Sequence, residues 1–543
     1  MAATMTQAPS VPSSSNAHQR LGGHVNEIII VTLILAISVA LLCYRGLFQL
    51  ELGGLDEAHN IMDGIFFHDL YTDWPFTSIV QYTYDYYKQY PALGFLFWPP
   101  FFPAVEGIIF KLFGISLTSA QLTIYLFTLI LAVTFYWLAR TRMAAAPALC
   151  GTLILITTPG LYPYMNTTMR EVPTIAMMTL VLLIYLRISR ATAMPAKILP
   201  WQSLALMASL ALYTKQPSFI MFPGILADLL VNRRHLLTQQ AVWLSALTFT
   251  LLTLPLVIFT LKFGHANIQQ SVGTGTSLIM SHYEGLQRWS MDSWLYYPQA
   301  LPEIFSPVLL ALLAISGFFC IRSPRFAAEN ILLITWIIGF YLIFSYFDNK
   351  YVRFTLLVCV PITLLAMNGT LHMLHELPKV STRLALIFLA VVAASGWQLQ
   401  GLKIQTMRGT SAISESVDLA HLDGNIAYWG KFRQAFVYHF RQADEDRKHF
   451  ILQADDLFTK ADNLEAMLKS YRIRIILIET DNLSDQEKNI ASALTSLPDI
   501  KHLSTGEFWS GFNHNNISLY KYDGALAEKM APIELSSTLI KSD

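Results

Sequence analysis

Long apolar segments alternate with short polar turns between residues 26 and 400. The first apolar segment is 28–43, and the others are 119–138, 145–159, 173–187, 201–214, 217–231, 241–261, 304–321, 329–346, 354–370 and 384–398. Each approaches the roughly 20 residues that a helix needs to cross the hydrocarbon core of a bilayer. The pattern therefore predicts a polytopic α-helical membrane domain at 26–400 with about eleven transmembrane helices.

Basic residues recur at every second connection between these segments. They are Arg140, Arg142, Arg187, Arg190, Lys197, Arg233, Arg234, Arg322, Arg325, Lys379 and Arg383. Because the positive-inside rule places such turns in the cytoplasm, the amino terminus is predicted to be cytoplasmic too. The alternate connections, at 46–118, 160–172, 262–303 and 348–353, and everything beyond residue 400 then lie outside.

The two ends of the chain lack this pattern. Residues 1–25 are rich in Ala, Ser, Thr and Pro and are expected to form a disordered cytoplasmic tail. Beyond residue 401 the apolar runs shrink to strand length, at 425–429, 449–452, 473–478 and 517–520, with charged helical stretches between them. Residues 401–543 are therefore predicted to form an extracytoplasmic soluble α/β domain, in which the acidic run at 444–446 is expected to be a solvated turn.

Composition agrees with a membrane protein and argues against one class of partner. Hydrophobic residues make up 54% of the chain and charged residues only 14%, which is more apolar than a soluble core requires. The 37 basic residues are balanced by 37 acidic residues, so no nucleic-acid partner is expected. Membrane lipids are the expected surroundings.

The first outer connection, 46–118, is too long for a simple turn and is rich in aromatic residues. Trp and Tyr side chains favour the membrane interface. Residues 99–114 begin with proline and contain apolar positions interrupted by Glu106 and Lys111, which predicts an interfacial helix. Such a helix would shape a lipid-facing site; the alternative is that the aromatic residues only anchor the loop.

Two adjacent carboxylates, Asp56 and Glu57, follow the first predicted span. Ionised groups close to hydrocarbon are costly, so acids at the membrane surface of so apolar a protein indicate a functional site. The alternative is that both belong to a solvated loop.

Further charged residues occur at connections predicted to face the same side. Arg170 and Glu171 begin a helix with proline in its first turn, where a carboxylate also serves simply as a cap. Lys215 lies where two short apolar helices meet, and it needs an anionic partner, either a protein carboxylate or a bound phosphate. Lys350 and Arg353 offer two cations at the outer end of another span.

These motifs follow one another in an order typical of one family. They are LDEAH at 55–59, WPPFF at 98–102, FKLFG at 110–114, REVP at 170–173, YTKQP at 213–217 and KYVR at 350–353. The chain from about 25 to 400 resembles the GT-C glycosyltransferases of the dolichyl-phosphate-mannose-protein mannosyltransferase and aminoarabinose lipid A transferase type. The resemblance implies transfer of a hexosyl or pentosyl group from a polyprenyl-phosphate sugar to a lipid, glycan or protein acceptor, at the outer face of a bacterial inner membrane.

The resemblance also implies roles for the carboxylates. Asp56 is expected to be the general base that deprotonates the acceptor hydroxyl, because inverting transfer from a lipid phosphate needs such a base. Glu57 is expected to support Asp56, and Glu171 to orient the base or the acceptor. Arg170 and His59 are expected to contact the acceptor or to support the site.

By the same resemblance, cations hold the leaving phosphate. Lys215 and Arg353 are expected to do so, with Lys350 as a further candidate. A lipid phosphate is already a tolerable leaving group, so the chemistry does not demand a metal, although a divalent metal is compatible with it. Some relatives bind one through a carboxylate and a histidine; the candidates here, to which no metal site is assigned, are His59, Glu106, His265 and His282.

The sequence departs from the family pattern in two places. The family usually has Asp where this chain has Glu171, and often a polar residue where this chain has Trp98. A secondary transporter or flippase of lipid-linked sugars is the alternative function, and a non-catalytic assembly factor is another. A transporter would place its acids in mid-membrane helices as proton relays, whereas here they lie in outward connections.

Overall fold

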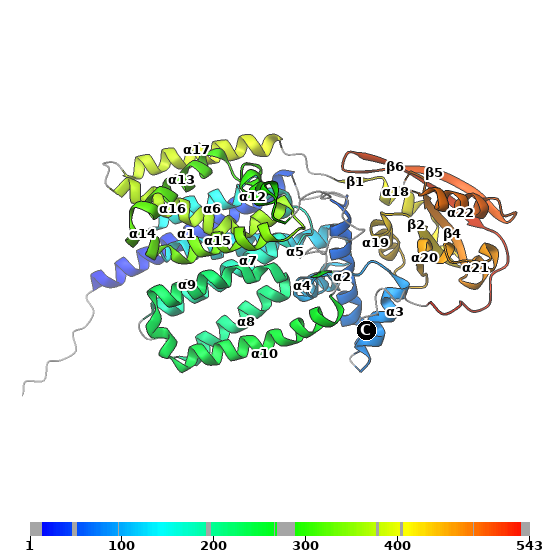
Figure 1. The fold of residues 1–543 in the computed structure, drawn as a ribbon, viewed down its shortest axis with the longest axis horizontal. Helices are drawn as coiled ribbons and strands as arrows, with labels where there is room; N and C mark the ends of the chain where they lie inside the picture. The colour runs from blue at the N-terminus through cyan, green and yellow to red at the C-terminus, as the bar shows by residue number, and fades with distance from the viewer. Residues whose placement is uncertain are drawn as a thin grey trace, which may run out of the picture.

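The computed structural model describes residues 14–45, 51–75, 77–95, 97–191, 197–264, 267–268, 288–375, 380–401, 406–481 and 483–533. A bundle of helices makes up one part of the molecule, and an α/β domain of carboxy-terminal residues lies at one end of the bundle (Figure 1). Helix α2 (Leu55–Asp73) lies between these two parts (Figure 1).

A helix occupies each of the predicted apolar segments. These helices are α1 (Ser14–Arg45), α5 (Leu117–Arg140), α6 (Ala145–Ile156), α7 (Glu171–Arg190), α8 (Ile198–Thr214), α9 (Phe222–Asn232), α10 (Gln240–Phe263), α13 (Pro307–Arg322), α15 (Ile331–Tyr346), α16 (Cys359–His375) and α17 (Val380–Gly401). The polytopic helical architecture is thus confirmed.

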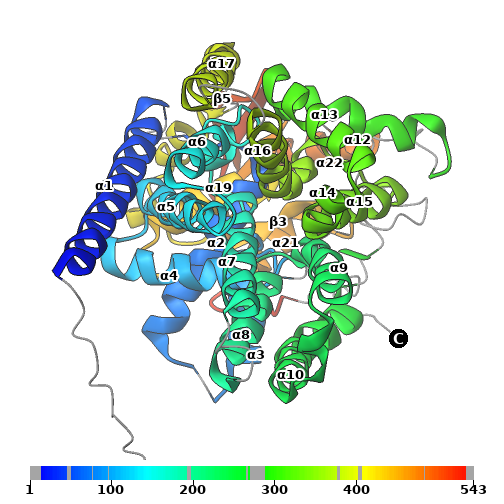
Figure 2. The ribbon, with the colours of Figure 1, turned by 90° about the vertical axis from the view of Figure 1, so that its left-hand side faces the viewer.

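Length and hydropathy distinguish the helices that could cross a membrane. Among the described residues, 6 helical segments satisfy both criteria: 25–44, 117–140, 171–190, 240–263, 352–374 and 382–400. Helices α6, α8, α13 and α15 are apolar but shorter. The number of transmembrane helices therefore stays a prediction. Seen from the end opposite the α/β domain, α7 and α16 lie inside the bundle (Figure 2), in agreement with their burial.

Two predicted segments differ from the structure. Helix α1 begins at Ser14, so the predicted disordered tail is helical from that residue on, while residues 1–13 lie outside the described part of the chain. The predicted loop 262–303 contains α12 (Met291–Ile304), whose first turn is capped by the Ser290 side chain. This helix holds two internal prolines, Pro298 and Pro302, which is why its sequence reads as a loop.

The long connection at 46–118 is built mainly from α2, α3 (Ile79–Gln89) and α4 (Phe101–Phe113). A helix is thus confirmed within the predicted segment 99–114, whereas α2 is unexpected because polar residues occur on all its sides. Helices α2 and α4 pack closely: a Cβ on Gly107 would lie 2.8 Å from the backbone nitrogen of His68. Glycine at that position therefore lets α4 hold α2 in place.

The carboxy-terminal domain contains a mixed six-stranded sheet with strand order β1-β5-β6-β4-β2-β3. The strands are β1 (Met407–Arg408), β2 (Asn425–Trp429), β3 (Ile451–Gln453), β4 (Ile473–Glu479), β5 (Ile500–Ser510) and β6 (Asn513–Tyr522). Strands β3, β2 and β4 are parallel, and the remaining pairs are antiparallel. Strands β2 and β4 are buried along their whole length, which explains their continuous apolar runs.

Helices cover both faces of this sheet. Helices α20 (Ala454–Phe458), α21 (Leu464–Ser470) and α22 (Asp485–Thr495) pack on one face, and α19 (Arg433–Ala443) packs on the other. The predicted strands are confirmed as β2, β3, β4 and β6, and the α/β character of this region is confirmed with them.

Helix α19 also joins the α/β domain to α2. The Arg441 side chain donates to Asp69 of α2 at 2.7 Å, and both side chains are almost fully buried. At the carboxyl end of α2, Arg447 forms a second ion pair with Asp73. Apolar residues of the two helices share one cluster, which includes Ile61, Ile65, Phe436 and Phe440. Helix α2, which carries the predicted base Asp56 in its first turn, is therefore held between the bundle and the α/β domain.

The acidic run at 444–446 takes part in the same interface, so the prediction of a solvated turn is wrong for Asp444. This residue is buried, and its carboxylate accepts hydrogen bonds from the Tyr90 hydroxyl and from the backbone N–H groups of Lys448 and His449. The other two acids of the run are exposed, as predicted.

Candidate active site

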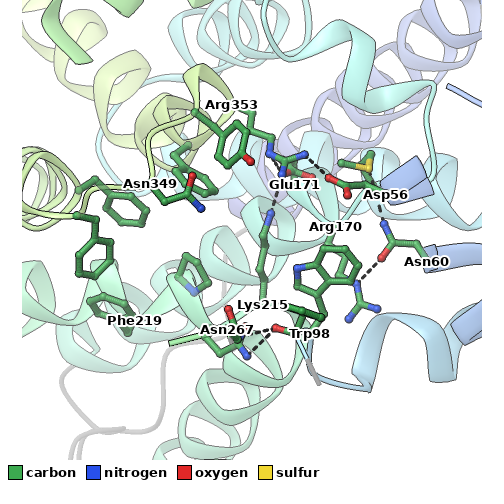
Figure 3. A pocket seen from close by; sticks show the side chains of 18 of the residues that line it. Asp56, Asn60, Trp98, Arg170, Glu171, Lys215, Phe219, Asn267, Asn349 and Arg353 are labelled. Carbon is green, nitrogen blue, oxygen red and sulfur yellow. Dashed lines mark hydrogen bonds and ion pairs between the residues drawn. The ribbon is translucent and has the colours of Figure 1, made fainter. Parts of the chain in front are cut away.

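Four charged side chains from four elements meet at the end of the bundle next to α2 (Figure 3). Asp56 and Glu171 lie in the first turns of α2 and α7, Lys215 follows α8, and Arg353 lies in the 3-10 helix η5 (Val352–Val358). Arg353 Nη1 donates to Asp56 at 2.8 Å, and Lys215 Nζ donates to Glu171 Oε1 at 2.6 Å. Arg353 Nε lies 3.7 Å from the same Glu171 oxygen, so the four groups form a chain of alternating charges.

The sequence allowed either a protein carboxylate or a bound phosphate as the partner of Lys215, and the structure shows a protein carboxylate. The cluster nevertheless keeps unused polar atoms. Within the described part of the chain, Glu171 Oε2 and Arg353 Nε are buried and have no hydrogen-bond partner. Buried polar atoms without partners are rare in folded proteins, and they are frequent where a ligand completes the network.

The two carboxylates differ in access to solvent. The Asp56 side chain is 39% exposed, whereas that of Glu171 is 4% exposed and lies beside two cations. Burial raises the pKa of Asp56, but the neighbouring cations, Arg353 foremost, together lower it by more, so the pKa of Asp56 lies below its ordinary value. Asp56 is therefore ionised at neutral pH and is the more accessible of the two acids.

The cluster forms one wall of a cavity of about 270 Å³. Asp56, Glu171, Lys215 and Arg353 line it together with Asn60 and Arg170. The rest of the lining is largely aromatic and includes Phe97, Trp98, Phe219, Phe344, Phe347 and Phe354. A few convergent charges beside an apolar wall suit a ligand with a polar head and an apolar body.

Glu57 and His59 do not line this cavity. Glu57 is buried and accepts hydrogen bonds from the backbone N–H groups of Gly53 and Thr168, so it ties the start of α2 to the segment before α7. Burial lowers the pKa of His59, whose Nδ1 lies 2.8 Å from the Ala92 carbonyl oxygen. The structure thus gives both residues contacts that hold α2 in position.

Arg170 lies at the base of the cavity and is almost completely buried. Its guanidinium donates to Asn60 and Asp63 of α2, at 2.7 Å in each case, and to the carbonyl of Pro99. These bonds join α2, the start of α4 and the start of α7. Arg170 therefore fixes the relative position of the helices that carry Asp56 and Glu171.

The structure corrects the prediction that Lys350 is one of the phosphate-binding cations. Its side chain is fully buried, and its ammonium group donates to the carbonyls of Phe344, Ser345 and Phe347 at the end of α15. Cations favour this position because the carbonyl end of a helix carries partial negative charge. Lys350 does not line the cavity, so it stabilises α15 and is left out of the site.

Two site residues were missed from the sequence. Asn60 lines the cavity, and Asp63 pairs with Arg170 behind it. Asp56, Asn60 and Asp63 are spaced by four and then three residues, which places polar groups on one face of a helix. That spacing was the available signal, but it requires the segment to be recognised as helical.

The described residues contain no group of three or more His, Cys, Asp or Glu side chains that could hold a metal ion. Of the candidates suggested by sequence, His265 and His282 lie outside the described residues. His59 is bound to a backbone carbonyl, and Glu106 is buried against Gly64.

Comparison with known proteins identifies the fold. Residues 98–259 match the family model described as dolichyl-phosphate-mannose-protein mannosyltransferase. No curated protein sequence gives a significant match. A crystal structure of ArnT from Cupriavidus metallidurans bound to undecaprenyl phosphate superposes with a TM-score of 0.58 at 13% identity, covering 93% of this chain and 99% of that one.

The oligosaccharyltransferase AglB of Archaeoglobus fulgidus, in complex with an inhibitory peptide and a dolichol-phosphate, has a TM-score of 0.51 at 11% identity. That match covers 83% of this chain and 69% of AglB. The apo form of the Archaeoglobus fulgidus oligosaccharyltransferase gives a TM-score of 0.54 at 10% identity, covering 90% of this chain and 74% of that one. The resemblance to the GT-C glycosyltransferases is thus confirmed, and the chain has their membrane-protein fold.

Proposed function

We propose that the protein is an integral-membrane glycosyltransferase that moves a hexosyl or pentosyl group from a polyprenyl-phosphate donor to an acceptor hydroxyl. The observation that carries the proposal is the cavity in which an accessible carboxylate, Asp56, lies beside the cations Lys215 and Arg353 and an aromatic wall. The lipid-phosphate ligands of the matched ArnT and AglB structures support the same class of donor.

The reaction assigns one task to each charged group. The acceptor oxygen attacks the anomeric carbon of the sugar and transfers its proton to Asp56, while the bond from that carbon to the phosphate oxygen breaks. The polyprenyl phosphate leaves with the electron pair, and Lys215 and Arg353 stabilise its developing negative charge. Glu171 holds both cations in place before the donor arrives.

Donor binding and activation of the base are coupled in this arrangement. Arg353 is engaged by both carboxylates, and its contact with Asp56 is the main influence that lowers the pKa of Asp56. A donor phosphate that attracts the guanidinium away from Asp56 removes the main cause of the low pKa. Asp56 thereby becomes a stronger base when the donor is in place.

The position of the acids favours a transferase over a transporter. Asp56 and Glu171 lie in the first turns of their helices, at one end of the bundle, rather than midway along a span. A proton relay across the membrane would need ionisable groups along the interior of the bundle. The acceptor, whether lipid, glycan or protein, is left to experiment.

The proposed site faces outward, with a cytoplasmic amino terminus, in a bacterial inner membrane; the alternating basic turns support this orientation. A cysteine at Ser484 of the α/β domain should react with an impermeant thiol reagent in spheroplasts, in a background without the four native cysteines. A cysteine at Arg234 should not react. The opposite labelling pattern would place Asp56 on the cytoplasmic side and contradict the outward orientation.

The activity is tested directly with purified protein and a panel of polyprenyl-phosphate sugars and candidate acceptors. Mass spectrometry should detect donor bound to the protein and an acceptor that has gained one sugar. Donor transport across a liposome membrane without any glycosylated product would reject the transferase and favour the transporter.

A further inference from the structure

A second cavity lies at the opposite end of the bundle from the proposed active site. Its volume is about 540 Å³, and it is lined by the turn between α5 and α6, the carboxyl ends of α7 and α9, α14 (Pro324–Glu329) and α16. Helix α7 contributes to both cavities, with Glu171 at one end and Arg190 at the other. Its 20 residues separate these two by about 30 Å, the thickness of a bilayer core.

Three arginines line this cavity, and two of them lack an acidic partner. Arg233 is paired with Asp228 at 2.6 Å. Among the described residues, no carboxylate lies within ion-pair distance of Arg142 or Arg190. The Arg142 guanidinium donates only to neutral oxygens, the Glu329 carbonyl and the Asn330 side chain, and its Nε is buried without a partner. Arg190 donates only to the Thr141 carbonyl.

The acids at this cavity are already engaged. Asp228 accepts from Arg233, from the Tyr185 hydroxyl at 2.7 Å and from Asn232 at 2.8 Å. The Glu329 carboxylate is paired with the exposed Arg325 on the outside of α14. Within the described residues, therefore, neither carboxylate forms an ion pair with Arg142 or Arg190.

The uncompensated charge has an energetic consequence. Burial lowers the pKa of Arg142 to about 10, and repulsion from the neighbouring Arg190 acts in the same direction. Asp228 attracts both arginines and Glu329 attracts Arg142, but neither acid forms an ion pair with them, so a bound anion reduces the repulsion between the two guanidinium groups. Arg190 is exposed, but it lines the same cavity as Arg142, so a ligand in this cavity can contact both guanidinium groups.

We propose that this cavity binds a phosphate-bearing anion between Arg142 and Arg190. A guanidinium presents paired N–H donors that match two phosphate oxygens, so two of them suit a phosphate better than a carboxylate or a neutral ligand. The site lies one membrane thickness from the active site, at the level of the opposite lipid headgroups. An anionic phospholipid headgroup and free phosphate share this chemistry, and they are distinguished by experiment.

The test uses native mass spectrometry of the full-length protein in detergent, titrated with phosphatidylglycerol, with phosphatidylcholine for comparison. Arg142→Gln and Arg190→Gln should each weaken phosphatidylglycerol binding about tenfold or more, as expected for loss of a charge-assisted contact. Arg322→Gln is the matched control, because it removes the same charge from the same end of the bundle at an exposed side chain that does not line the cavity. This variant should change the affinity less than about threefold, as expected for an exposed charge outside the cavity.

Inorganic phosphate identifies the source of the anion. If millimolar phosphate displaces phosphatidylglycerol from the wild type but not from Arg190→Gln, the proposed site is supported and its ligand is free phosphate. If phosphatidylglycerol binds and phosphate does not displace it, the site is supported and its ligand is a lipid headgroup. Equal phosphatidylglycerol affinity in wild type and in the Arg142, Arg190 and Arg322 variants, with no phosphate binding, overturns the proposal. Arg190→Gln disturbs one hydrogen bond only, so it remains informative if Arg142→Gln fails to fold.

Discussion

Replacing Asp56 by Asn separates its proposed role as a base from any structural role. The amide keeps the size of the side chain and an oxygen that accepts the 2.8 Å hydrogen bond from Arg353, but it cannot take a proton at neutral pH. Because the side chain is 39% exposed, the substitution buries no new unsatisfied group. Folding and donor binding should therefore survive.

The size of the effect on turnover follows from the proton transfer that is lost. General-base catalysis contributes about 10²- to 10⁴-fold to a rate, so kcat should fall by that factor. The corresponding rise in the activation barrier is about 2.7 to 5.4 kcal/mol. The donor KM should change little, since Lys215 and Arg353 remain to bind the phosphate.

The assay is single-turnover transfer of sugar from a saturating donor, with product measured by mass spectrometry. Asp85→Asn is the matched control, because Asp85 is an exposed carboxylate on α3 of the same outer segment and outside the cavity. This variant should transfer sugar at the wild-type rate. Near-normal transfer by Asp56→Asn, in protein that extracts and unfolds as wild type does, would refute the assignment of Asp56 as the base.

Three further substitutions test the surroundings of Asp56. Arg353→Gln should raise the pKa of Asp56, because burial raises this pKa and the main cation that lowers it is then missing. The acid limb of the pH profile of kcat/KM should therefore move to higher pH. An unmoved limb would contradict the proposed effect of Arg353 on Asp56. Lys215→Ala should raise the donor KM by about 10- to 150-fold, equivalent to about 1.5–3 kcal/mol, and an unchanged KM would leave Lys215 a purely structural partner of its acid. Asp69→Asn should leave Arg441 buried without its counter-charge, costing about 3–5 kcal/mol, and should lower the apparent Tm.

Matched controls exist for these variants as well. Arg288→Gln removes an arginine that pairs with Asp348 and does not line the cavity, so it should leave the acid limb of the pH profile in place. Asp485→Asn removes a fully exposed carboxylate of the α/β domain and should leave the apparent Tm unchanged.

The sequence by itself determined the helical membrane architecture, because apolar runs of spanning length have few alternative structures in a bilayer. It also indicated the strands β2 and β4, whose continuous apolar runs reflect burial on both faces. The acids Asp56 and Glu171 and the cations Lys215 and Arg353 stood out because charges are rare in so apolar a chain.

Only the tertiary structure decided which charges act together. Lys215 and Lys350 look alike in sequence, yet one faces the cavity and the other is used by the carbonyls that end α15. Helix α2 escaped detection because its polar residues have partners far along the chain: Asp63 meets Arg170 and Asp69 meets Arg441. Local periodicity cannot identify a helix whose buried face is polar, since the burial of each charge depends on a partner that only folding brings near.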